Sequence, residues 1–309
     1  MLENILSVGS QVLILFVLVA VGFICRKTGI LTEKGIKSIS DLVVYVVTPA
    51  NIVVAFCRDF KTDLLIGLGM AFLAAFLVYG AATVIAGLTI REKDENKRSV
   101  LRFAGAYPNA GYMGIPLQRA LLGDIGVFYC AAYIGMFHMY VWTYGVYVLS
   151  GDKKQISVKK LLTSPCILAI IIGLLLFFLP IELPELIDSP LRSLASLATP
   201  LPMMVIGYHL AGSNLKAIMG NGWVHLAIIV KMMISPILAI ILCLLLKFDH
   251  SMAVSCLIAC SSSSAAMTTM LATKFNRDAE LSAAIVSYST LLAIIVIPVF
   301  VSIVGYLIP

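Results

Sequence analysis

The sequence predicts an all-α polytopic membrane protein that crosses the bilayer ten times, and three observations lead to that fold class. First, 61% of the 309 residues are hydrophobic and 12% are charged, whereas an ordinary soluble domain has roughly 25% charged residues. Second, apolar runs long enough for a bilayer core of about 30 Å follow one another from Val12 to Ile308. Third, a Thr-Pro landmark recurs half-way along the chain. The bilayer is therefore the solvent in which this chain folds.

Each expected helix is an apolar run bounded by charged residues or by Gly, Pro or Asn. The ten runs cover residues 5–25, 36–57, 64–90, 99–122, 126–149, 161–179, 190–211, 222–247, 252–273 and 280–307. An even number of spans places both termini on the same side of the membrane.

The distribution of basic residues orients these spans. Sixteen of the 22 Lys and Arg residues lie in or beside alternate connections, such as those at Arg26, Arg91, Lys153, Lys216 and Arg277. Because basic loops stay in the cytoplasm, we expect a multi-pass protein of the cell (inner) membrane with both termini non-cytoplasmic. The clusters separate apolar spans and do not form one basic face, so nucleic acid is not an expected partner.

The seven cysteines lie mostly within or at the ends of apolar segments and show no paired metal spacing. We therefore expect neither a metal nor a cofactor.

Two landmarks recur at an offset of 151 residues and suggest an internal duplication. Thr48-Pro49 recurs as Thr199-Pro200, and Gly22 recurs as Gly173. The expected units are a first five-helix repeat at 1–150, a cytoplasmic loop at 151–160 and a second repeat at 161–309. An odd number of helices per half makes the repeats inverted. Chance is the alternative, since Gly and Pro are common in membrane helices.

Two expected helices in corresponding positions should be broken. The run 99–122 contains Pro108, Gly111 and Pro116 within a dozen residues, and the run 252–273 contains the consecutive serines Ser261, Ser262, Ser263 and Ser264. Irregular backbone at this depth persists where it is buried in protein or lines a cavity, so the two breaks mark the expected substrate site. Half-helix N-termini favour an anion there, and neither broken segment contains Asp or Glu.

At these residues the chain resembles the auxin efflux carrier family, whose bacterial members are often called malate or malonate permease-like proteins. The resemblance lies in Pro49, in the string Asn109–Pro116, in Trp142–Gly145 and in Pro200. It implies a fold similar to sodium/proton antiporters and bile-acid symporters, with the fourth and ninth helices crossing, an elevator-type motion and a homodimer. The chain departs from the family pattern at Ser262–Ser264, where a proline is usual, and at His138, where asparagine is common.

Each candidate site residue has two interpretations. The amide of Asn109 binds a carboxylate substrate or caps the following half-helix. The serines line the site or allow close helix packing. His138 relays protons or makes a structural hydrogen bond. Lys231 attracts the substrate or extends toward the interface. Pro49, Pro116 and Pro200 are expected to break or kink their helices.

The leading functional hypothesis is a secondary transporter that moves a small organic anion, such as a carboxylate or an auxin-like acid. The nearest alternative is a sodium- or proton-coupled symporter of the bile-acid type. An intramembrane enzyme would need a nucleophile elbow or a metal motif, and the sequence has neither. A receptor without transport would need a soluble signalling domain, which the sequence lacks.

Overall fold

The computed structural model describes residues 2–179, 183–215 and 218–308, with side chains of α1 from Gly9 onward. Lys216, one of the basic residues that orient the spans, lies outside the described residues. Within them the chain is helical and contains no sheet, only one isolated β-bridge.

The first half of the chain contains α1 (Leu2–Lys27), α2 (Glu33–Leu42), η1 (Val43–Val47), α3 (Thr48–Phe56), α4 (Thr62–Thr89), α5 (Glu95–Ala106), η2 (Ala110–Gly114), α6 (Ile115–Leu122), α7 (Asp124–Tyr140), η3 (Val141–Gly145) and α8 (Val146–Ser150). The second half contains η4 (Lys153–Gln155), α9 (Val158–Leu162), α10 (Pro165–Phe178), α11 (Glu185–Ser196), α12 (Pro200–Gly212), α13 (Gly222–Ile229), η6 (Val230–Ile234), α14 (Ser235–Leu245), α15 (His250–Ser261), α16 (Met267–Lys274) and α17 (Ala279–Leu307).

Eight helical segments of the described chain are long and apolar enough to cross a membrane. They are Gly9–Lys27, Glu33–Phe56, Thr62–Thr89, Asp124–Ser150, Lys153–Phe178, Glu185–Gly212, Gly222–Leu245 and Ala279–Leu307. Large apolar side chains such as Leu13, Leu88 and Ile295 are more than half exposed on these segments. A membrane gives such side chains an apolar solvent, which explains why they are not packed inside.

The two remaining expected helices are each divided into halves. The run expected at 99–122 is α5 followed by η2 and α6, with Tyr107–Asn109 outside any helix. The run expected at 252–273 is α15 followed by α16, with residues 262–266 between them. Each half is shorter than the roughly 20 residues that span a bilayer, so neither half is long enough to cross it alone.

Prolines account for several local departures from α-helix. Pro49, Pro116 and Pro236 stand at the second position of α3, α6 and α14, and each follows a five-residue π-helical segment. A proline cannot donate a backbone hydrogen bond and collides with the carbonyl four residues back, so the turn before it widens. At Pro200 the change is larger, because α11 ends at Ser196 and α12 begins at the proline itself.

The recurring glycines make equivalent helix contacts. Gly22 of α1 lies against the backbone of Met204 in α12, and a Cβ added to it would stand 2.1 Å from the Met204 carbonyl oxygen. Gly173 of α10 lies against Phe56 of α3, where an added Cβ would stand 2.8 Å from the ring. Each glycine thus packs on the helix that follows the Thr-Pro pair of the other half, and small residues are what such close approach requires.

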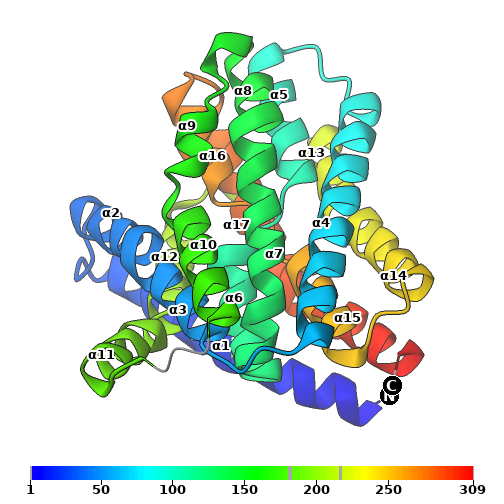
Figure 1. The fold of residues 1–309 in the computed structure, drawn as a ribbon. Helices are drawn as coiled ribbons and strands as arrows, with labels where there is room; N and C mark the ends of the chain where they lie inside the picture. The colour runs from blue at the N-terminus through cyan, green and yellow to red at the C-terminus, as the bar shows by residue number, and fades with distance from the viewer. Residues whose placement is uncertain (1, 180–182, 216–217, 309) are drawn as a thin grey trace.

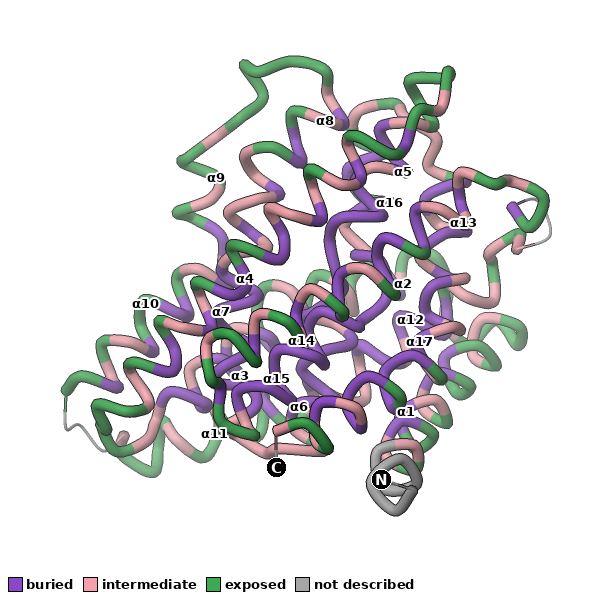
Figure 2. The backbone as a smooth tube through the Cα atoms, turned by 90° about the vertical axis from the view of Figure 1, so that its right-hand side faces the viewer, coloured by how far each residue is buried: buried purple, intermediate pink, exposed green. Residues whose placement is uncertain are grey.

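The helices form one bundle (Figure 1). The connections after α4, after α8 and after α16 lie at one end of it, and the beginning of α1 and the end of α17 lie at the other. Buried segments cluster around α6, α7 and α15, while α9, α10 and α11 at the periphery carry much of the exposed surface (Figure 2). The two helix breaks are therefore inside the bundle and away from lipid.

Candidate functional site at the crossing of two broken helices

The break in the first broken helix is short and extended. The helix α5 ends at Ala106, Tyr107 has extended dihedral angles (φ −110°, ψ 129°), and the helical path resumes at Ala110. Pro108 lacks the N–H that would continue the helix. The break therefore follows from the local sequence.

The second break pairs with the first. The backbone N–H of Asn109 donates to the carbonyl of Ser263 at 2.8 Å, and the N–H of Ala265 donates to the carbonyl of Tyr107 at 2.9 Å. These bonds flank an antiparallel bridge between Pro108 and Ser264. With no water available, an interrupted helix must find partners for its backbone elsewhere in the protein. Each broken helix supplies those partners to the other, so the two breaks form one structural unit.

Ser264 fixes this unit to its surroundings. Its hydroxyl donates to the carbonyl of Ala104 in α5 at 2.9 Å, and its N–H donates to Oγ of Ser289 in α17 at 3.0 Å. Ser289 and Ala104 are members of the site that sequence reasoning missed, because a single serine or alanine in an apolar helix gives no local signal.

The other serines do not have equal roles. The hydroxyls of Ser261 and Ser262 donate back to the carbonyls of Leu257 and Ile258, four residues earlier in α15, which is a common local bond for serine in a helix. Ser263 is completely buried, yet its hydroxyl has no hydrogen-bond partner among the described residues. Of the four serines, Ser263 is the one with an unused hydroxyl.

Asn109 also has unused hydrogen-bonding capacity. Its side chain is 5% exposed, and Nδ2 has no partner in the described chain. The side chain makes no capping bond, since the N–H groups of Met113 and Gly114 donate to the backbone carbonyl of Asn109. A buried amide group without a hydrogen-bond partner lowers the stability of the folded state by about 1–3 kcal/mol, and such groups are rare in proteins.

Gly111 follows Asn109 by two residues in η2. A Cβ added to Gly111 would meet no atom within 4 Å. Close packing therefore does not require a glycine at this position.

Lys231 brings a buried cationic side chain to the crossing. It lies in η6, is 0% exposed and donates from Nζ to the carbonyl of Cys260 at 2.6 Å. That carbonyl belongs to the last turn of α15, the negative end of the helix dipole, and immediately precedes Ser261. The side chain therefore does not extend to the interface, and in the described chain none of the three ion pairs involves it.

His138 lies elsewhere. Nδ1 is 3.3 Å from the hydroxyl of Ser164, the residue that precedes α10, and the ring is buried edge-on to Phe137. The contact links α7 to α10, so the structure does not bring His138 to the paired breaks through a hydrogen bond.

A second polar contact lies at the opposite end of α6 from the break. Nη2 of Arg119 donates to Oδ1 of the fully buried Asn51 in α3 at 2.5 Å and lies 2.9 Å from Oδ1 of Asp124. Sequence reasoning counted Arg119 only as a loop charge and did not consider Asn51, although an asparagine two residues after Pro49 in an apolar run was a usable signal.

No group of three or more His, Cys, Asp or Glu side chains in the described residues is placed to hold a metal ion. The arrangement offers hydrogen-bond donors and one buried ammonium group. Such groups can donate to and attract an anion.

A comparison with protein-family models matches residues 7–301 to the family described as membrane transport protein, the auxin efflux carrier family. The chain belongs to this family. It is consequently a multi-pass membrane transport protein and not an enzyme. The resemblance expected from Asn109–Pro116 and the other motifs is thereby confirmed at the level of the family.

Two curated relatives are transporters without an assigned substrate. An uncharacterized transporter of Methanocaldococcus jannaschii is 27% identical over 296 residues, covering 93% of this chain and 95% of the relative. An uncharacterized transporter of Methanothermobacter thermautotrophicus is 24% identical over 300 residues, covering 94% and 96%. The similarity extends over both halves of the chain, so the match to these transporters is not confined to one half.

Proposed function

We propose that this transporter carries a small organic anion across the cytoplasmic membrane and binds its carboxylate at the crossing. The observation that carries the proposal is a pair of buried groups at the paired breaks, Asn109 Nδ2 and Ser263 Oγ, which have no hydrogen-bond partner among the described residues. Both can donate a hydrogen bond, and a carboxylate is an acceptor.

The charge of Lys231 supports an anionic substrate. Among the described residues it is the one Lys, Arg, Asp or Glu that is fully buried. An ammonium group in a membrane interior is expensive unless something compensates it. In our proposal the carbonyl of Cys260 holds the group in place, and the bound anion supplies the opposite charge during transport.

The architecture that we propose has ten spans, the eight long segments together with the two broken ones. Residues 1–150 and 161–309 would be inverted repeats. The equivalent contacts of Gly22 and Gly173 support this, because each joins one half to the other in the same way. The end of the bundle that carries the basic connections would face the cytoplasm, with both termini outside (Figure 1).

In the proposed mechanism, α1, α3, α10 and α12 form a fixed group and the crossing moves against it, as in elevator-type transporters. The tight glycine contacts join α1 to α12 and α3 to α10, so each of these two helix pairs is closely packed. Among the described residues, few side-chain hydrogen bonds join these helices to the crossing helices, and one of them is that of Arg119 in α6 with Asn51 in α3. We propose that a homodimer, whose formation light scattering in detergent would test, supports the fixed group.

The test is uptake by liposomes that contain the purified protein. Labelled malate, malonate and indole acetate are offered with and without imposed sodium and pH gradients. We expect saturable uptake of at least one acid and its loss in Asn109→Ala. Asn214→Ala, an exposed asparagine outside the crossing, is the matched control. Uptake by Asn109→Ala with wild-type affinity and rate would show that the carboxylate binds elsewhere.

The second candidate function is sodium- or proton-coupled symport of the bile-acid type. The serine hydroxyls and the carbonyls at the breaks favour it, because unwound backbone coordinates coupling ions in other transporters. Uptake that collapses when the sodium or pH gradient is removed would select this alternative.

A further inference from the structure

A cavity of about 240 Å³ opens between α5 and α8, at the end of the bundle where the basic connections lie. Its walls include Arg98, Ser99 and Arg102 of α5, and Tyr144, Tyr147 and Val148 of η3 and α8. It is separate from the helix crossing, since none of these residues takes part in the paired breaks.

The two arginines make the cavity positive. A guanidinium N–H of Arg98 donates to the carbonyl of Glu92 at 3.0 Å, and that of Arg102 donates to the carbonyl of Ile90 at 3.1 Å. These bonds orient both groups without neutralising them. Neither arginine takes part in an ion pair of the described chain. Each guanidinium has further N–H groups available for a ligand.

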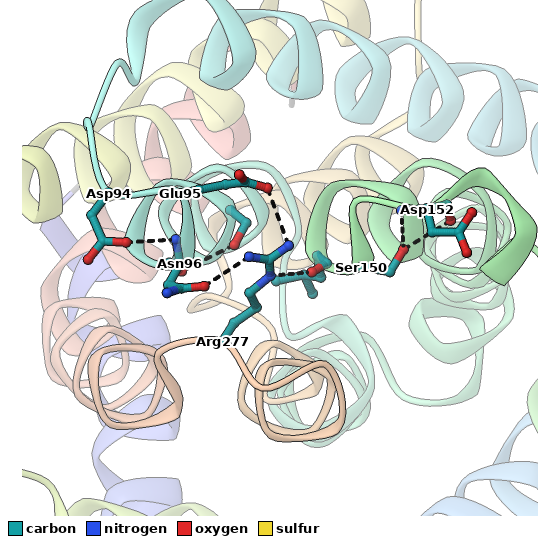
Figure 3. A network of polar contacts seen from close by, with 8 residues as sticks. Asp94, Glu95, Asn96, Ser150, Asp152 and Arg277 are labelled. Carbon is teal, nitrogen blue, oxygen red and sulfur yellow. Dashed lines mark hydrogen bonds and ion pairs between the residues drawn. The ribbon is translucent and has the colours of Figure 1, made fainter.

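The acidic residue at the rim is already paired. Oε1 of Glu95 lies 3.3 Å from Nη2 of Arg277. Nη1 of the same arginine donates to Oδ1 of Asn96, and its Nε donates to the carbonyl of Leu149 (Figure 3). The same arginine therefore compensates Glu95 and ties the start of α5 to the end of α8. The charge of the cavity that remains is that of Arg98 and Arg102.

The tyrosine wall and the depth of the site match the headgroup region of a bilayer. The rings of Tyr144 and Tyr147 are 6.3 Å apart and each side chain is more than a third exposed. Tyrosine is enriched at this interface. Arg98 and Arg102 are three and seven residues inside α5, roughly 5 and 10 Å at 1.5 Å per residue. The ammonium of Lys153 stands 6.0 Å above the Tyr147 ring, adding a third cation at the rim.

We propose that this cavity binds the phosphate of an anionic phospholipid, with the guanidinium groups of Arg98 and Arg102 donating to phosphate oxygens and the tyrosines flanking the headgroup. Basic pockets between membrane helices on the cytoplasmic side bind such lipids, and arginine is suited to phosphate. The bound headgroup would connect α5, one half of a broken helix, to α8. The inference does not depend on which substrate is transported.

The experiment is native mass spectrometry of the full-length protein in detergent, with phosphatidylglycerol or phosphatidylcholine added at equal concentration. We expect a one-to-one adduct with phosphatidylglycerol and at least a tenfold weaker apparent affinity in Arg98→Gln/Arg102→Gln. The matched control is Lys93→Gln/Lys97→Gln, which removes the same charge from exposed residues of the same connection and helix. It should bind as the wild type does.

A second variant keeps the test valid if the arginine variant folds poorly. Val148→Phe fills the cavity without changing any charge and should also lose the adduct. Wild-type binding by either cavity variant, or an equal loss in the lysine control, would overturn the proposal. Inorganic phosphate and glycerol 3-phosphate are each added as a competitor in a separate measurement. Displacement of the lipid by millimolar inorganic phosphate would show that the cavity binds phosphate, but that its ligand is free phosphate and not a lipid headgroup.

Discussion

Two neighbouring serines provide a sharp test of the crossing, because the hydroxyl of Ser264 has a hydrogen-bond partner and that of Ser263 has none among the described residues. Ser264 donates to the carbonyl of Ala104, and both Ser263 and Ser264 are at most 1% exposed. Changing Ser264 to Ala removes a buried bond worth about 1 kcal/mol. Changing Ser263 to Ala removes a buried hydroxyl that no described protein group uses, so it should leave the empty protein at least as stable as the wild type.

The two substitutions should affect transport in the opposite order, with the larger loss in Ser263→Ala. If Ser263 donates to the carboxylate, Ser263→Ala removes a charge-assisted hydrogen bond worth roughly 1.5–3 kcal/mol. That corresponds to about a tenfold to hundredfold weaker affinity, since about 1.4 kcal/mol is tenfold. The variant should therefore be at least as stable as the wild type and poor in uptake.

The assays are thermal denaturation in detergent, followed by intrinsic fluorescence, and uptake into liposomes. We expect Ser264→Ala to lower the midpoint by on the order of 2 °C, with transport reduced less than in Ser263→Ala. The assignment of Ser263 to the substrate is refuted if Ser263→Ala loses as much stability as Ser264→Ala while its half-saturating substrate concentration stays unchanged.

Three further predictions follow from the same geometry. Ser289→Ala leaves the N–H of Ser264 without its acceptor, so it should cost about 1–3 kcal/mol, and a thermal midpoint equal to that of the wild type would contradict this. Lys231→Gln removes the buried ammonium group. At an assumed separation of about 8 Å and an effective dielectric constant of about 20, the attraction between this group and a bound anion is roughly 2 kcal/mol. The half-saturating anion concentration should therefore rise at least tenfold, and an unchanged value would exclude charge compensation by Lys231. Gly207→Ala places a Cβ 1.9 Å from a backbone oxygen of α1 and should lower the free energy of unfolding by about 1–3 kcal/mol. The control Gly69→Ala meets no atom within 4 Å and should leave the stability unchanged. Equal thermal midpoints for the two variants would show that α1 and α12 do not pack closely at Gly207.

The amino-acid sequence by itself determined where the helices break. Pro108 removes a backbone donor whatever surrounds it, and a run such as Ser261–Ser264 offers its backbone local alternatives. The apolar runs likewise determined a membrane protein, because an apolar run needs an apolar solvent in any fold. These properties depend on residues close together in the chain, so they can be predicted from the amino-acid sequence alone.

Only the tertiary structure decided which polar groups are left unused. The N–H of Asn109 finds the carbonyl of Ser263 more than a hundred residues away, and no local pattern specifies that partner. Of these neighbouring serines, the hydroxyl of Ser264 bonds to Ala104, whereas the hydroxyl of Ser263 has no partner in the described chain. It also directs Lys231 inward to a helix end and His138 to Ser164. Hydrogen-bond satisfaction depends on which segments meet in space, and that is a property of the packed bundle and not of residue type.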